Sequence, residues 1–158
     1  MDNQHSESDK PGTASQFTWL LRVYYEDTDA GGVVFYANYI KFFERARTEW
    51  LRACGADQNA LASASGLIFV VRSTSMDYRA PARLDDTVRI ASQIERMGRA
   101  SIDFKQSAYR NDILLTTGST RVACVERDSF KPSPIPEHIR QALSNWNQDG
   151  SVNWSPAK

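Results

Sequence analysis

The hydrophobic and polar positions of the chain change period twice. Aromatic and branched residues are concentrated from Phe17 to Tyr25, which predicts a first strand. From Asn38 to Cys54 the apolar residues recur every three or four positions, which predicts one helix that buries a single stripe. The stripe consists of Tyr39, Phe43, Ala46, Trp50 and Cys54. Gly55 is well suited to end this helix in the left-handed conformation.

The opposite side of this helix is charged, and we expect it to face solvent. Its residues are Lys41, Glu44, Arg45, Arg47, Glu49 and Arg52. A shorter helical turn is predicted from Asp57 to Ala64, closed by Gly66.

Beyond Leu67 the period becomes alternating, which predicts four further strands. They run from Leu67 to Arg79, from Val88 to about Glu95, from Ala100 to Lys105 and from Ile113 to Glu126. A hairpin turn at residues 110–112 is expected to join the last two strands, and Gly118 is expected to form a bulge.

Composition divides the 158 residues into one packed region with a tail at each end. Residues 1–15 are polar, so we expect a disordered tail. Residues 16–130 hold the strands and the long helix and are expected to form one domain. Residues 131–158 begin with alternate prolines, which predict a stiff connector, and continue with a short helix from Glu137 to Trp146 and a polar end. One long helix beside about five antiparallel strands predicts an α+β fold whose twisted sheet wraps the helix.

The charge balance and the apolar runs exclude several classes of protein. Lysine plus arginine equal aspartate plus glutamate at 19 each, which argues against nucleic acid as a partner. The longest apolar run, Leu67 to Val71, is far shorter than the ~20 residues of a membrane span, and the first residues lack an apolar signal region. We therefore expect a cytoplasmic protein with no membrane span. Cys54 and Cys124 form no Cys-x-x-Cys motif and are expected to be reduced and packed.

The two histidines are poorly placed for a central site. His5 lies in the polar tail and His138 near the C-terminal end. Their positions argue against a catalytic triad that includes histidine and against a histidine-rich metal site. If the chain is an enzyme, we expect its catalytic group to be a carboxylate, with no metal or redox cofactor.

The stretch at residues 23–40 combines acids, a Gly-Gly pair and the start of the long helix. Asp27 and Asp29 precede Gly31 and Gly32, whose backbone freedom permits a positive φ and close approach of a substrate. A helix N-terminus offers free N–H groups and partial positive charge, so it can hold the oxygen of a polarised carbonyl while a nearby carboxylate reacts. This arrangement suggests acyl transfer. The alternative for either acid is to order the loop, which we expect of Asp27.

Residues 22–55 and 78–86 resemble the 4-hydroxybenzoyl-CoA thioesterase family of hotdog-fold proteins, most closely its Tol-Pal-associated acyl-CoA thioesterase branch. The similarity rests on Tyr-Tyr-Glu-Asp-Thr-Asp-Ala-Gly-Gly-Val-Val at 24–34, Ala-Asn-Tyr at 37–39 and Glu-Arg-Ala-Arg-Thr-Glu at 44–49. It also includes Tyr-Arg-Ala-Pro-Ala-Arg-Leu-Asp-Asp at 78–86. It covers about residues 17–130 and implies a hotdog fold.

The resemblance implies hydrolysis of short- to medium-chain or aromatic acyl-CoA by Asp29, as nucleophile or as general base toward water. It implies that the backbone N–H at Tyr36 holds the thioester carbonyl, with Gly32, Val33 and Phe35 beside it. Members of the branch often carry histidine at the position of Tyr36. No histidine side-chain role therefore carries over, but any residue except proline supplies the N–H.

The resemblance also implies a site between subunits of a homodimer or homotetramer, and a link to the Tol-Pal envelope system. Acyl carrier protein or enzymes of lipid synthesis are then expected as further partners. Arg72, Arg83 and Arg99 are candidates for the phosphates of coenzyme A, because arginine forks match phosphate oxygens. Two alternatives remain: a hotdog dehydratase, which would need a histidine in its site, and a non-catalytic acyl-thioester-binding or scaffold protein.

Overall fold

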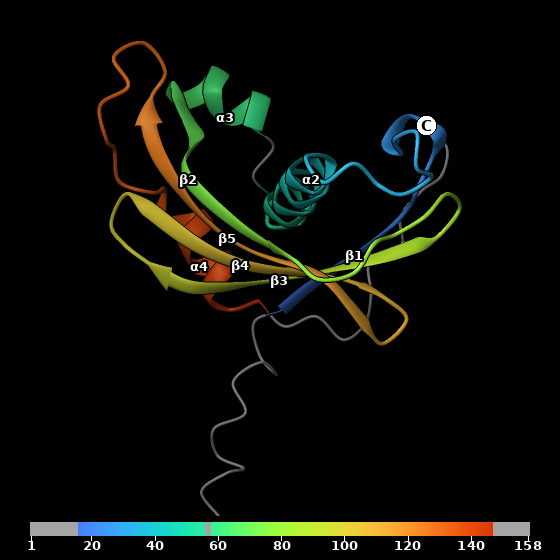
Figure 1. Ribbon diagram of the computed structural model, residues 1–158. Helices are drawn as coiled ribbons and strands as arrows, with labels where there is room; N and C mark the ends of the chain where they lie inside the picture. The colour runs from blue at the N-terminus through green and yellow to red at the C-terminus, as the bar shows by residue number, and fades with distance from the viewer. Residues whose placement is uncertain (1–15, 56–57, 147–158) are drawn as a thin grey trace, which may run out of the picture.

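The structure, a computed structural model, describes residues 16–55 and 58–146 (Figure 1). The tails expected at residues 1–15 and after residue 146 lie outside the described residues. The elements in chain order are β1 (Gln16–Arg22), the 3-10 turn η2 (Tyr25–Asp27), α2 (Asn38–Ala53), α3 (Gln58–Ser65), β2 (Leu67–Tyr78), β3 (Thr87–Met97), β4 (Ser101–Arg110), β5 (Ile113–Glu126) and α4 (Glu137–Ser144).

The strands form one antiparallel sheet in the order β1-β3-β4-β5-β2. The sheet curves around α2, which lies along its concave face (Figure 1). This is the predicted α+β hotdog arrangement of five strands around one long helix. The strand expected from Ile113 to Glu126 has the predicted bounds, and Gly55 follows α2 with a φ of 86°, as expected.

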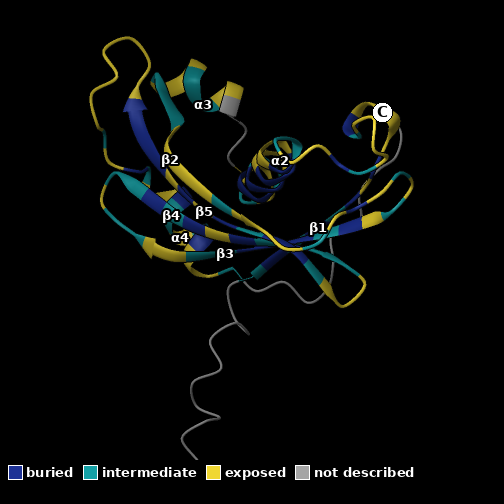
Figure 2. Ribbon diagram, in the orientation of Figure 1, coloured by how far each residue is buried: buried dark blue, intermediate teal, exposed yellow. Residues whose placement is uncertain are grey.

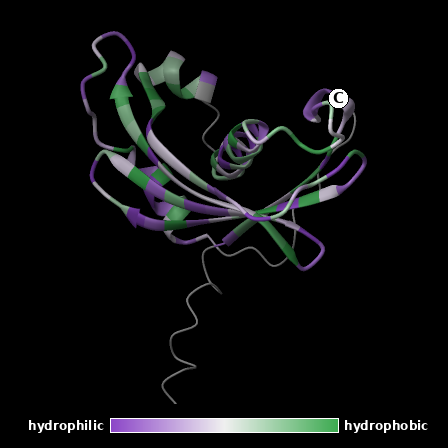
Figure 3. Cartoon of the chain, viewed as in Figure 1, coloured by the Kyte–Doolittle hydropathy of each residue, from purple (hydrophilic) through white to green (hydrophobic). Residues whose placement is uncertain are grey.

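The side of α2 that faces the sheet is buried and hydrophobic (Figures 2 and 3). Four residues of the predicted stripe, from Tyr39 to Trp50, are buried, whereas Cys54 is partly exposed. Phe42 and Leu51 are also buried, so the buried surface is wider than the predicted stripe. A strongly curved sheet covers more of a helix than a flat one, which accounts for the extra width.

Arg47 contradicts the expectation that the charged side of α2 faces solvent. Only 7% of this residue is exposed, and its Nη1 donates a 2.9 Å hydrogen bond to Gln106 Oε1. The Gln106 amide in turn donates to the Phe43 carbonyl and to Ser92 Oγ, both at 2.9 Å. Burial lowers the pKa of the guanidinium to about 10. The prediction was wrong because periodicity does not show how far the sheet reaches around the helix.

Gly118 does not form the bulge that the sequence predicts. It pairs in regular register with Met76 on β2 and with Gln106 on β4. A Cβ at this position would lie 2.7 Å from Met76 Sδ and 2.8 Å from a ring carbon of Phe43. Glycine is therefore required here because α2 packs directly on the sheet, and not because the backbone needs freedom.

β1 ends three residues before the predicted Tyr25. Tyr24 and Tyr25 favour strands, but the Asp27 carboxylate accepts a 2.8 Å hydrogen bond from the Tyr24 N–H and draws the chain into η2. A local side-chain bond to the backbone thus replaces the strand ladder.

Residues 131–146 pack against the end of the core that lies beside the last turn of α2. Arg140 Nη2 donates a 2.8 Å hydrogen bond to the carbonyl of Gly98, which holds α4 against the β3–β4 turn. Trp146 contacts Phe17 and Trp50, with ring centroids 5.7 and 6.2 Å away. The buried side chains of this segment are Ile135, Ile139 and Leu143. The packed unit therefore includes α4.

Candidate active site

The loop between β1 and α2 is held by Asp27, which is only 8% exposed. Its carboxylate accepts the Tyr24 N–H, and its carbonyl accepts the Phe35 N–H at 3.0 Å and Asn38 Nδ2 at 2.8 Å. Asp27 therefore joins the start of the loop to its end and to the first residue of α2. The expected structural role of this aspartate is confirmed.

Asp29 lies two residues further on and is exposed. Its N–H donates to the Val33 carbonyl at 2.9 Å, and its carbonyl accepts the Gly32 N–H at 3.0 Å. Its Oδ1 accepts the Gly31 N–H at 2.8 Å. Among the described residues, Oδ2 accepts no hydrogen bond and no cation pairs with the carboxylate. The backbone is thus fixed, while one carboxylate oxygen stays available for chemistry.

Gly32 has a φ of 81°, so the expected positive φ of the Gly-Gly pair occurs at its second residue. The turn reverses the chain so that Thr28 pairs with Val34 across the loop. Val34 then donates its N–H to the Ala82 carbonyl at 2.8 Å, and Val33 pairs with Arg83. The segment that follows β2 therefore supports the far side of the Asp29 loop.

The chain from Phe35 to Ala37 leads into the N-terminus of α2. The first helical bonds run from Asn38 to the Phe35 carbonyl and from Tyr39 to the Tyr36 carbonyl, at 2.8 and 3.2 Å. The N–H groups of Tyr36 and Ala37 donate no hydrogen bond within the described part of the chain. Both are free to bind an oxygen at the positive end of a 16-residue helix.

Aromatic side chains gather beside these free N–H groups. The Tyr36 ring contacts Phe35 at 4.8 Å and Tyr78, the last residue of β2, at 5.6 Å between centroids. All three are exposed, whereas Tyr39 is buried against Phe42 and Tyr78 and belongs to the core. Partial burial, and secondarily Tyr36, raise the pKa of Tyr78, so its phenol is neutral at physiological pH. Tyr78 was not among the site residues expected from sequence, although it begins one of the motifs quoted above.

The three arginines expected to meet phosphates lie in three different places. Arg83 lies beside the loop, through its pairing with Val33. Arg72 lies on β2, six residues before Tyr78 and therefore roughly 20 Å along the strand. Arg99 lies in the β3–β4 turn, beyond the far end of β3 from Arg83. Arg72 lines a depression together with Ala100 and Ser101, which follow Arg99 in the chain, whereas Arg83 lies beyond the opposite end of β3 from them.

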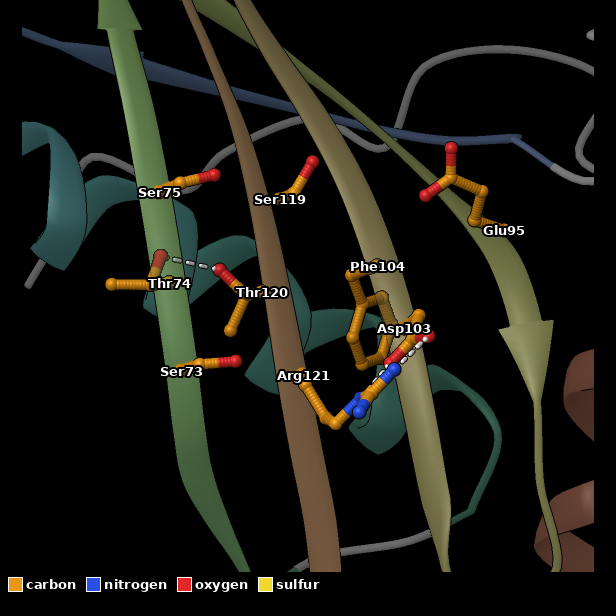
Figure 4. Close-up of a pocket in the computed structure, with 9 residues that line it drawn as sticks. All are labelled: Ser73, Thr74, Ser75, Glu95, Asp103, Phe104, Ser119, Thr120 and Arg121. Carbon is orange, nitrogen blue, oxygen red and sulfur yellow. Dashed lines mark hydrogen bonds and ion pairs between the residues drawn. The ribbon is translucent and has the colours of Figure 1, made fainter.

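Two depressions lie over the sheet at a distance from the loop. One, of about 350 Å³, is lined by residues of β2, β3, β4 and β5, among them three serines and Arg121 (Figure 4). Arg121 makes two hydrogen bonds to the Asp103 carboxylate, at 2.7 and 3.0 Å, and these lower the pKa of Asp103. The other, of about 430 Å³, is lined by Arg72, Arg121 and Pro132 among others. Neither contains the Asp29 loop.

No group of three His, Cys, Asp or Glu side chains in residues 16–55 and 58–146 is arranged to hold a metal ion. None of the helices in these ranges is long and apolar enough to cross a membrane.

The chain is similar to known proteins in both sequence and structure. Residues 31–117 match the thioesterase superfamily. The acyl-CoA thioesterase YbgC of Haemophilus influenzae is 42% identical over 127 residues, which cover 80% of this chain and 93% of that protein. The acyl-CoA thioester hydrolase YbgC of Escherichia coli is 46% identical over 124 residues, covering 78% and 92%. A DHNA-CoA thioesterase structure from Staphylococcus aureus, 25% identical, has a TM-score of 0.76 and covers 82% of this chain and 89% of that one.

Proposed function

The chain belongs to the thioesterase superfamily, and we propose that it hydrolyses acyl-CoA thioesters with Asp29 as its catalytic carboxylate. One observation carries the assignment. An exposed carboxylate with an available oxygen sits on a hydrogen-bonded loop that leads directly to free backbone N–H groups at the start of α2. The names of the two YbgC relatives support acyl-CoA as the substrate class.

The proposed chemistry has two parts. The N–H of Tyr36 donates to the thioester carbonyl oxygen and stabilises the negative charge that develops there, for which one donor is typically worth about 3 to 4 kcal/mol. Asp29 either attacks the carbonyl carbon or removes a proton from the water that attacks it. In both cases the C–S bond breaks and the coenzyme A thiolate leaves and takes up a proton. If Asp29 attacks, a mixed anhydride forms, which water then hydrolyses to release the acid and restore the carboxylate; if Asp29 acts as base, the attacking water supplies the oxygen of the acid directly.

The residues around the loop have supporting roles in this proposal. Gly32 sets the turn that presents Asp29, and Val33 joins the loop to Arg83. Phe35 and Tyr36 offer exposed aromatic surface to the acyl group. Arg83 is the candidate for a phosphate of coenzyme A from the same chain, while Arg72 and Arg99 are candidates only for a site shared with another subunit.

Several finer expectations stay predictions from the resemblance. They include short- to medium-chain or aromatic acyl groups, the Tol-Pal link, and acyl carrier protein or lipid-synthesis enzymes as partners. A homodimer or homotetramer with the site at the subunit interface is also a prediction from the resemblance. The absence of a histidine from the described loop supports a thioesterase over a hotdog dehydratase.

The test compares Asp29→Asn with the native chain in release of free thiol from short, medium, long and aromatic acyl-CoA. The substitution keeps the size of the side chain and removes its charge, so we expect turnover to fall by about 100-fold or more. Asp112→Asn, which changes an exposed aspartate in the β4–β5 turn, is the matched control and should keep native turnover.

Three outcomes separate the alternatives. Native turnover by Asp29→Asn would make the site assignment wrong. Binding of acyl-CoA by the native chain without hydrolysis would favour the non-catalytic acyl-thioester-binding protein. A transient acyl adduct on the Asp29 peptide, seen by mass spectrometry during a single turnover, would assign the nucleophilic route.

A further inference from the structure

Residues 79–86, which we call the support segment, connect β2 to β3 and carry the far side of the Asp29 loop. The Ala82 carbonyl accepts the Val34 N–H at 2.8 Å, and Ala82 is completely buried. The part of the loop that follows Asp29 therefore rests on the support segment. A shift of this segment would also move the Asp29 carboxylate.

The two ends of the support segment are held by backbone hydrogen bonds. The N–H groups of Arg79 and Ala80 both donate to the Leu115 carbonyl, at 2.8 and 3.1 Å. At the other end the Val23 N–H donates to the Asp86 carbonyl at 2.9 Å. The middle of the segment belongs neither to β2 nor to β3, so it needs a support other than a strand ladder.

The Arg110 side chain, at the end of β4, supplies this support. Its Nη1 donates a 2.8 Å hydrogen bond to the Pro81 carbonyl and a 3.4 Å hydrogen bond to Asp86 Oδ2. The same Asp86 oxygen accepts the Arg83 N–H at 2.8 Å. The Arg110 and Asp86 side chains are only 26% and 25% exposed. A charged donor shared by two acceptors and partly shielded from water holds its partners more firmly than an exposed ion pair does.

The pair of Arg110 and Asp86 also lies close to the first turn of α2. Burial raises the pKa of the Tyr39 phenol, while the charge of Arg110 lowers this pKa and the charge of Asp86 raises it. Tyr39 lies three residues after Tyr36, whose N–H is free. One ion pair therefore lies beside both the support segment and the helix start that carries the free N–H groups.

We propose that Arg110 is a positioning residue, which fixes the support segment and thereby the place of the Asp29 carboxylate relative to the Tyr36 N–H. It acts through the segment and not on the reacting atoms. A misplacement of about 1 Å, even one caused far from the chemistry, can cost ~100-fold in rate. The inference rests on the proposed function of Asp29, so its test includes a measurement that needs no hydrolysis.

The kinetic test compares Arg110→Gln with Arg79→Gln. Arg79 Nη2 lies 2.9 Å from Asp77 Oδ2 in an exposed pair, so each variant loses one positive charge and one partner aspartate. We expect kcat per folded chain to fall about 10-fold in Arg110→Gln, with KM within about twofold of native, and to stay native in Arg79→Gln. Arg110→Lys keeps the charge and one donor, so it should recover most of the loss. A residue that only stabilised the fold would leave kcat per folded chain unchanged.

Amide hydrogen exchange tests the same link without substrate. In Arg110→Gln the Val34 N–H should exchange about 10-fold faster, whereas Ile90, in the middle of β3, should keep its native rate. Native exchange at Val34, or equal acceleration at both amides, would overturn the inference. If the native chain hydrolyses no thioester, the proposed function fails, but the exchange rates still decide whether Arg110 holds the loop.

Asp86→Asn covers the case in which Arg110→Gln does not fold. It removes the charge that faces Arg110 and keeps a side-chain oxygen for the Arg83 N–H. We expect kcat to fall about threefold and Val34 to exchange faster. Where both variants fold, adding Asp86→Asn to Arg110→Gln should lower kcat little further, because the shared contact is already lost. Losses that multiply in the double variant would show that the two residues act independently and would contradict the proposal.

Discussion

The two ends of α2 use aromatic residues in opposite ways. At its N-terminal end, which we call the open end, Tyr24, Tyr25, Phe35, Tyr36 and Tyr78 are exposed. At its C-terminal end, which we call the closed end, Phe17, Trp50 and Phe104 are almost fully buried and Trp146 packs against them. Roughly 24 Å of helix separates them. Residue type alone does not distinguish binding surface from core.

The difference lies in what supports each end. The closed end is held by side-chain packing, such as the stacked rings of Phe17 and Trp50 with centroids 5.7 Å apart. The open end is held by backbone hydrogen bonds from Asp27, Asp29 and Val34, which fix the loop and leave its side chains exposed. A site built in this way keeps its geometry while its side chains stay available to a ligand.

The largest effect on stability should come from the closed end. Trp50→Ala removes a fully buried ring and should cost about 3 to 5 kcal/mol of the free energy of unfolding. Tyr25→Ala, at a residue that is 81% exposed, should change it by about 0.5 kcal/mol or less. Denaturant unfolding of both variants at one protein concentration measures the contrast. Equal losses would contradict the division between the two ends.

Two aspartates of the open end, Asp27 and Asp29, should respond differently to substitution. Asp27→Ala leaves the half-buried Tyr24 N–H without its acceptor and should cost about 1 to 3 kcal/mol of stability. Its turnover should also fall, because the loop loses its anchor. Asp29→Asn should instead lose turnover with little change in stability. Thermal unfolding and thiol release should be measured on both variants. An equal loss of stability in the two variants would contradict the prediction.

The smallest effect concerns the cysteines. Burial raises the pKa of the Cys54 thiol, at the end of α2, to about 11, and also raises the pKa of Cys124. Only the thiolate reacts, and a raised pKa leaves less of it below pH 8. Both thiols should react with Ellman's reagent roughly 100-fold more slowly in the native chain than after unfolding in guanidinium. Rapid reaction of the native chain would show that Cys54 is more open than the packing indicates.

Some features could be predicted because neighbouring residues determine them. The spacing of apolar residues predicted α2, and the alternation from Ile113 to Glu126 predicted β5. Asp27, whose carboxylate accepts the N–H of Tyr24 three residues away, was recognised as an anchor for the same reason. Asp29 and Tyr36 were singled out by motif and family resemblance. Their catalytic roles stay predictions.

Other features depended on contacts between distant parts of the chain. The Tyr78 ring contacts Tyr36 only because β2 ends beside the loop, and no local sequence pattern predicts this contact. Gly118 was expected to form a bulge. Glycine is instead required there because the Phe43 ring and the Met76 sulfur leave no room for a Cβ. The α4 segment was expected outside the domain, yet its residues share the core.

The sequence by itself determined the elements, their order and the polar loop before α2, because periodicity and turn chemistry act within a few residues. Only the tertiary structure decided that Arg47 is buried, that Arg83 supports the Asp29 loop, and that β2 forms one edge of the described sheet. These outcomes depend on how far the sheet curves around the helix. That curvature follows from the packing of all five strands at once, which no single stretch of sequence specifies.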